Sequence, residues 1–218
     1  MLGQGNTLGS QGLLYRDSSK KDWATSLNTV SGIRNTMDQG SGTKFFNPTD
    51  ENVQKYLISL LKDLAKYDVD GIILDRGRFE GIDSDFSEST KKKFEAYLGG
   101  VKIQNFPEDI LPTGATMTQG RELTNSGTTP VYFKQWNEFR AKNIYEFMEK
   151  ARNAVKSVNS DISFGVYVGG WYSTYYEVGV NWASKKYNTS ATYGKWATPK
   201  YQEFGYAALM DQILIGAY

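Results

Sequence analysis

The sequence predicts an α/β fold of the (β/α)8 TIM-barrel type, and this chain supplies an incomplete part of that barrel. Short apolar stretches alternate with amphipathic helical stretches, which is typical of parallel strands joined by helices. No glycine-rich phosphate loop opens a helix, so the open doubly wound sheet that binds nucleotides is disfavoured. A full barrel needs about 250 residues, whereas only four strands are predicted in these 218 residues.

The first predicted elements are a short strand and a long helix. Residues 12–18 form a candidate strand that ends in Arg16 and Asp17, and a loop rich in Gly, Ser, Thr and Asn follows it. The helix begins near Asn47, which can cap it, and Pro48 suits its first position. Its apolar side chains recur at helical spacing, namely Val53, Leu57, Leu60, Leu61 and Leu64.

A strand over residues 70–75 and a short helix come next. The strand is continuously apolar, as expected of a strand buried on both faces of a parallel sheet. Asp85 or Ser87 caps the short helix and Gly99 ends it. Residues 99–130 then form a loop that is long enough to be a lid or a binding loop.

The last third of the chain completes the alternation. A long amphipathic helix is predicted over residues 132–158 and a strand over residues 161–170. A helix capped by Thr198 and begun by Pro199 leads to a final strand over residues 212–218.

The composition limits the classes of function. With 39% hydrophobic and 22% charged residues, residues 1–218 suit one globular domain. The net charge is +1 and the charges are mixed, so a nucleic-acid partner is not expected. No run of about 18 apolar residues could span a membrane, and the first residues lack the pattern of a signal peptide.

The chain has no cysteine and no histidine. This absence excludes disulfides, thiol nucleophiles, Ser-His-Asp triads and the usual zinc ligands. Acid–base chemistry therefore falls to Asp, Glu, Lys or Tyr, and we expect no metal and no cofactor. Asp83 and Asp85 are interpreted as turn and capping residues rather than as calcium ligands.

Asp75 is the candidate catalytic residue. Alternation along the strand places it on the same face as Gly71 and Ile73, at the strand end where TIM-barrel enzymes position catalytic groups. Arg76 or Arg78 can bind its carboxylate through two parallel hydrogen bonds. The alternative is an ion pair that only joins the strand to its loop.

Residues 45–79, FFNPTDENVQKYLISLLKDLAKYDVDGIILDRGRF, resemble the bacterial TIM barrels of glycosyl hydrolase-like family ten. The resemblance extends to the helix from Trp136, the strand FGVYVGGW and the closing apolar strand. It implies a sugar-processing barrel that is secreted, periplasmic or at the cell surface of a bacterium. The family pattern has a histidine two positions before the strand-end aspartate and a second acidic residue after it. Asp75 matches, but Ile73 and Arg76 occupy the other two positions.

Aromatic residues are concentrated between residues 171 and 206. Aromatic faces beside polar groups suit the flat C–H faces and hydroxyl rims of sugars. The predicted binding aromatics are Tyr167, Trp171, Tyr172, Tyr176 and Tyr218. Core packing is an equally consistent interpretation of Trp171 and Tyr172, and it is the preferred one for Trp182, Phe204 and Tyr206.

The predicted function is that of a glycoside hydrolase or a related enzyme that acts on an oligosaccharide or polysaccharide. Glu177 is the best-placed second catalytic carboxylate, with a solvated loop residue as its alternative. Arg16 and Asp17 are further candidates for substrate binding, with a surface turn as their alternative. The rival functions are a glycan-binding barrel without catalysis and a structural domain whose rim is braced by ion pairs. We also expect a remaining barrel segment or a partner chain to cover the strand edge at Tyr218.

Overall fold

The computed structural model describes residues 3–4, 12–39 and 43–217. Its central sheet has three strands in the order β5–β6–β7: β5 (Gly71–Leu74), β6 (Ser163–Gly169) and β7 (Gln212–Gly216). Both pairings are parallel. The parallel arrangement predicted for these three strands is therefore confirmed.

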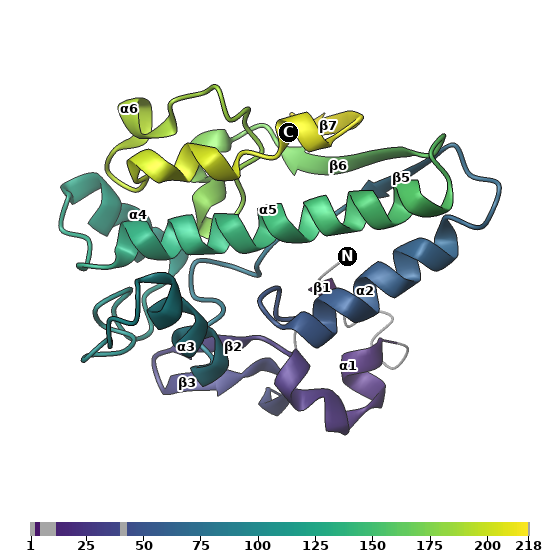
Figure 1. Ribbon diagram of the computed structural model, residues 1–218. Coiled ribbons are helices and arrows are strands. Elements are labelled where there is room, and N and C mark those ends of the chain that lie inside the picture. Colours follow the sequence, from purple (N-terminus) through teal and green to yellow (C-terminus); the bar gives the residue numbers. More distant parts are fainter. Residues whose placement is uncertain (1–2, 5–11, 40–42, 218) are drawn as a thin grey trace.

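Helices α2 (Glu51–Leu64) and α5 (Phe133–Val158) lie side by side along one face of this sheet (Figure 1). The predicted long helix is thus confirmed. Apolar side chains from both helices and from the strands fill the interface between these two layers. They include Leu57, Leu61, Ile72, Leu74, Ala151, Phe164 and Val166.

The opposite face of the sheet is open. Ile73 and Leu214 lie on it, with 37% and 46% of their surface exposed. The alternation of side chains predicted for β5 is correct, because Ile72 and Leu74 are buried whereas Gly71 and Ile73 are not. In a closed barrel this would be the inward face, but the described strands do not close a barrel.

The N-terminal part differs from the prediction. Residues 12–18 form no strand; they form the short helix α1 (Leu13–Arg16), followed by a 3-10 turn (Ser18–Trp23). Leu14 is the only residue of α1 that is buried, so this segment lacks the apolar run that a central strand needs.

Further short strands are present, and three of them lie after residue 18, where the sequence predicted only a loop. β2 (Ser26–Thr29) and β3 (Gly32–Asn35) form an antiparallel hairpin. β1 (Gly3–Gln4) pairs antiparallel with β4 (Lys44–Phe45).

The cap of α2 is Asp50 rather than Asn47, because the Asp50 side chain accepts hydrogen bonds from two backbone N–H groups of the first turn. Asn47 instead donates to the buried carboxylate of Asp85, at 2.8 Å. Leu60 and Leu64, predicted on the apolar face of this helix, are exposed.

Three shorter helices complete the chain: α3 (Glu88–Tyr97), α4 (Met117–Ser126) and α6 (Thr189–Tyr193). Ser87 caps α3, as predicted. α4 lies inside the segment that the sequence predicted to be a loop. The helix predicted after Thr198 is a 3-10 turn (Pro199–Phe204), and Thr198 does cap it.

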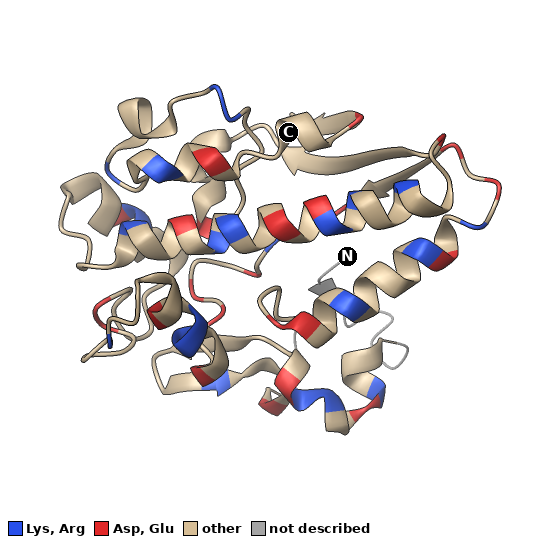
Figure 2. Cartoon of the chain, viewed as in Figure 1, with Lys and Arg blue, Asp and Glu red and all other residues tan. Residues whose placement is uncertain are grey.

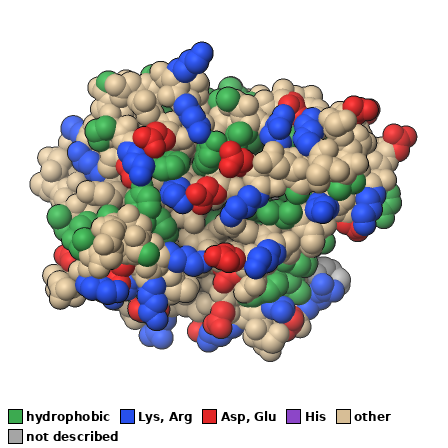
Figure 3. Space-filling model, viewed as in Figure 1, with side chains coloured by type: hydrophobic (Ala, Val, Ile, Leu, Met, Phe, Trp, Pro, Cys, Tyr) green, Lys and Arg blue, Asp and Glu red, His purple; other side chains and the backbone are tan. Residues whose placement is uncertain are grey.

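Charges of both signs are interspersed along α2 and α5 (Figure 2) and over the molecular face that these helices form (Figure 3). This distribution agrees with the mixed charge pattern of the sequence. None of the described helices is both long and apolar enough to cross a membrane.

Asp211 joins α5 to the sheet. Its carboxylate accepts a hydrogen bond from the Phe164 N–H at 2.9 Å and lies 2.8 Å from Lys156 Nζ. The hydrogen bond from Lys156, with that from Phe164, lowers the pKa of Asp211 to about 2. This stabilisation is complete above the ordinary pKa and is lost as the pH falls through about 2.

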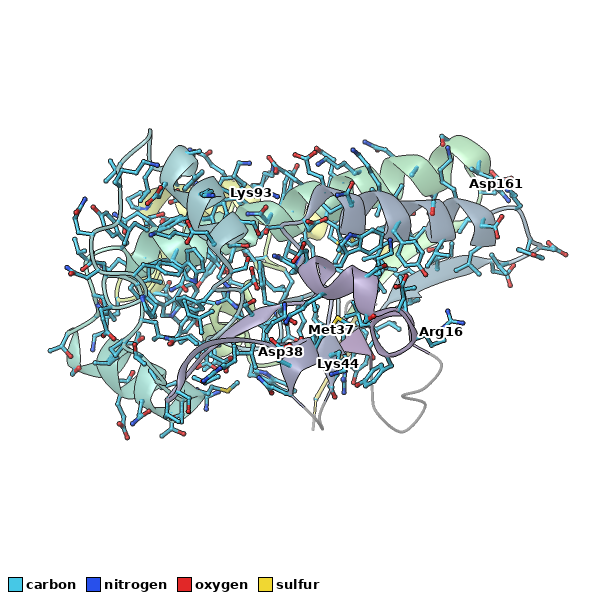
Figure 4. The ribbon with its side chains drawn as sticks, turned by 90° about the horizontal axis from the view of Figure 1, so that it is seen from below. Arg16, Met37, Asp38, Lys44, Lys93 and Asp161 are labelled. Atoms are coloured by element: carbon cyan, nitrogen blue, oxygen red, sulfur yellow. The ribbon has the colours of Figure 1, made fainter. Side chains whose placement is uncertain are left out.

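We therefore expect Asp211→Asn to lower the free energy of unfolding near neutral pH, and to have a smaller effect as the pH approaches the folded-state pKa. Urea denaturation at a series of pH values measures this difference. The control is Asp161→Asn, because Asp161 is exposed in the loop between α5 and β6 (Figure 4). The prediction would be contradicted if Asp211→Asn lowered the free energy of unfolding by the same amount at every pH.

Candidate functional site

A cleft lies at the carboxyl ends of β5 and β6, where the loops after both strands meet α4. It encloses about 920 Å³ of empty space, open solvent at its mouth included. The charged and aromatic side chains that line it are Asp75, Glu80, Glu177, Arg76, Arg78, Arg121, Tyr167, Trp171 and Tyr175. Three carboxylates, three guanidinium groups and three aromatic rings thus share one cleft.

Asp75 directly follows β5 and is exposed. Because Leu74 pairs with Val166, the next residues of the two strands, Asp75 and Tyr167, are neighbours on the open face of the sheet. Arg76 then has a φ of 52°, in the left-handed region that residues other than glycine seldom adopt. Backbone strain of this kind is concentrated at functional sites.

The predicted hydrogen bonds from arginine to Asp75 are not formed. Among the residues that the structure describes, neither Arg76 nor Arg78 makes an ion pair with this carboxylate. The Arg78 guanidinium is directed instead to the carbonyl oxygens of Phe79 and Glu80, each at 3.0 Å. Burial lowers the pKa of Arg78.

Glu80 is a candidate that the sequence analysis missed. It is half-buried, and its Oε2 accepts a 3.4 Å hydrogen bond from Thr25. Burial, reinforced by the negative charge of Asp83, raises the pKa of Glu80 to about 7. The carboxyl group can therefore hold a proton near neutral pH. The family pattern did not reveal Glu80, because it places the second acidic residue at the position of Arg76.

Glu177 lies in the 3-10 turn Tyr172–Val178 after β6. It is not a solvated loop residue, because only 3% of its side chain is exposed. Arg121 of α4 binds both of its oxygens, with Nε–Oε1 at 2.5 Å and Nη2–Oε2 at 2.8 Å. Arg121 and α4 were not predicted from the sequence, although Thr116 and Gln119 form a capping box there.

Arg140 of α5 connects the two loops that carry these acids. It is fully buried, and its Nη2 donates to the carbonyl oxygens of Gly81 at 2.5 Å and Glu177 at 3.1 Å. The guanidinium also lies 4.6 Å from the centre of the Phe79 ring. Arg140 therefore fixes the loop after β5 against the loop after β6.

Trp171 forms an aromatic wall of the cleft. Its surface is 42% exposed, and its ring lies 6.1 Å from that of Tyr175. The indole covers Gly169, where a Cβ atom would collide with it. Tyr175 is fixed in turn, because its hydroxyl accepts a 2.5 Å hydrogen bond from the Gly169 N–H.

Comparisons with known proteins identify the family of this chain. The model of the family described as glycosyl hydrolase-like 10 matches residues 16–198. This chain belongs to that family. It is also similar to an S-layer-related protein of Niallia circulans, with 32% identity over 204 residues. The alignment covers 87% of this chain and 12% of that protein, so the chain spans a small part of the relative's length.

Some aromatic candidates of this glycosyl hydrolase-like 10 chain lie away from the strand-end cleft. The Tyr172 hydroxyl donates to Asn181 at 2.9 Å, and its ring packs edge-on against Trp182. Tyr176 is buried and stacks on Trp196, with ring centres 4.6 Å apart. Neither ring lines the strand-end cleft, and Tyr172 is half-buried against its aromatic neighbours, which agrees with the packing alternative for this residue.

The remaining candidates are also remote or not described. Arg16 is exposed at the edge of the molecule (Figure 4), and Asp17 caps the following 3-10 turn. Neither lines the cleft. Tyr218 lies outside the described residues. In the described part of this glycosyl hydrolase-like 10 chain, no group of three or more carboxylates is placed to bind a metal ion.

Proposed function

We propose that this domain binds an oligosaccharide or polysaccharide in the strand-end cleft and hydrolyses its glycosidic bonds. The observation that supports this proposal is that Asp75, Glu80 and Glu177 line one cleft together with Trp171 and Tyr175. Glycoside hydrolysis uses two carboxyl groups, one as an acid and one as a nucleophile or base. Aromatic walls suit the apolar faces of sugar rings.

Glu80 has the properties of the general acid. With a pKa of about 7 it can donate a proton to the leaving oxygen at neutral pH. Asp75, exposed at the end of β5, takes the role of nucleophile or base. Glu177 was the second catalytic carboxylate expected from the sequence, but Arg121 already binds both of its oxygens. We assign it the role of fixing Arg121 at the wall of the cleft.

A second candidate function is glycan binding without catalysis. Ile73 and Arg76 stand where the family pattern has a histidine and a second acidic residue, which favours a site that has lost its activity. Because the Niallia relative is named as S-layer-related, we place either function outside the cell or at its surface.

One experiment separates these candidates. The protein is incubated with soluble cellulose, xylan, mannan and chitin fragments, while new reducing ends and the heat of binding are both measured. New reducing ends support hydrolysis, and heat without new reducing ends supports glycan binding alone. If neither is observed with any of these glycans, the proposal of a carbohydrate site is rejected.

We expect Trp171→Ala to weaken glycan binding by about 1 to 3 kcal/mol, because it removes a large apolar contact. Isothermal titration of the variant and the wild type measures this loss. Tyr67→Ala is the control, because Tyr67 is an exposed aromatic residue that does not line the cleft. If Trp171→Ala and the wild type bind the glycan with equal affinity, the Trp171 ring does not contact the bound sugar.

A further inference from the structure

A second hollow lies next to the strand-end cleft. Residues of α4, of the turn after β6 and of α6 line it, and it contains about 640 Å³ of empty space, open solvent included. Arg121 and Thr174 line both hollows. The two hollows are therefore adjacent, and together they are called the groove.

The second hollow offers mostly uncharged groups to a ligand. Of its two cations, Arg121 is paired with Glu177, whereas Lys195 donates to the carbonyl oxygen of Asn125 at 2.6 Å and keeps its positive charge. No carboxylate of the described residues lines it. Its other polar side chains carry hydroxyl or amide groups, namely Thr124, Asn125, Ser173, Thr174, Tyr176, Thr192 and Tyr193. Such a lining can exchange hydrogen bonds with sugar hydroxyls, but it has no acid for catalysis.

Tyr193 gives this hollow an aromatic wall. It is half-buried, and its ring stacks on that of Trp196 with a centre-to-centre distance of 5.2 Å and an angle of 20° between the planes. Trp196 is itself buried, so the Tyr193 ring rests on a fixed support. A ring with one supported face and an exposed part is suited to contact a sugar unit.

We infer that the groove binds a glycan chain of several units, which runs from Asp75 and Glu80 past Arg121 to Tyr193. The inference rests on the proposed function and adds the class of substrate. The substrate is a polymer or a long oligosaccharide, and the units that lie beyond Arg121 contact the hydroxyl and amide groups of the second hollow and the ring of Tyr193. Arg121 separates the reacting units from these outer units.

The test compares two-unit and six-unit oligosaccharides of cellulose, xylan, mannan and chitin by isothermal titration. We expect the six-unit ligand of one series to bind at least about tenfold more tightly than its two-unit ligand, because it gains an additional aromatic contact. Tyr193→Ala should remove that gain. Asn125→Trp should also remove it, because Asn125 is exposed and a large side chain there fills the hollow.

Ser126→Trp is the matched control. Ser126 is the next residue of α4, is exposed, and lines neither part of the groove. The gain with length should survive in this variant. The inference is overturned if both lengths bind with equal affinity, or if the gain with length persists in Tyr193→Ala and Asn125→Trp. In either case, binding of the two-unit ligands would still support the strand-end cleft. If no ligand of either length binds, the proposed function fails as well.

Discussion

Replacing Arg140 by leucine should lower the free energy of unfolding by about 1 to 3 kcal/mol for each backbone carbonyl group that loses its donor. Arg140 is fully buried, and its guanidinium donates to the carbonyl oxygens of Gly81 and Glu177. Leucine leaves these carbonyls without their donor in a place that water does not reach. An unpaired buried polar group costs about 1 to 3 kcal/mol.

Urea denaturation of the wild type and Arg140→Leu measures this loss. The control is Lys142→Gln on the same helix, which removes a partly exposed ion pair with Glu146. Such a pair contributes only about 0 to 1 kcal/mol. A loss no larger for Arg140→Leu than for this control would mean that Arg140 does not brace the two loops.

The sequence predicted those elements whose pattern is local and strong. The apolar run of β5 and the helical periodicity of α5 are visible in single stretches of sequence, and the parallel sheet follows from their alternation. The segment of α1 was misassigned because its few apolar residues fit a short strand as well as a helical turn. The helix α4 was missed because it is short and polar, although Gly127 ends it in the left-handed conformation.

The sequence predicted the part of the candidate site that lies at or shortly after the strand ends, because the predicted residues Asp75, Arg76, Arg78, Tyr167, Trp171 and Glu177 all line the cleft. Asp75 and Trp171 follow strands closely, and both line the cleft. The pairing of Arg121 with Glu177 joins residues 56 positions apart, so no local pattern reveals it. The raised pKa of Glu80 results from burial among residues of other segments, which is a property of the folded chain.

The largest functional effects are expected at the two proposed catalytic carboxyl groups. Asp75→Asn and Glu80→Gln keep the size of each side chain but remove its ability to ionise. If the domain is a glycoside hydrolase, each variant should lose about 10²- to 10⁴-fold in kcat on a natural glycan, the usual contribution of an acid–base group. The control is Glu122→Gln, because Glu122 is an exposed residue of α4 that does not line the cleft.

The pH dependence and the leaving group distinguish the roles of the two residues. Glu80 must be protonated to act as the acid, so wild-type activity should fall as the pH rises through about 7. A nitrophenyl glycoside needs no protonation of its leaving group. With this substrate Glu80→Gln should regain much of its activity, whereas Asp75→Asn should remain inactive because the nucleophile or base is still required. Near-wild-type hydrolysis of the natural glycan by Asp75→Asn would rule out Asp75 as a catalytic residue. Equal losses of Glu80→Gln on both substrates would rule out Glu80 as the acid.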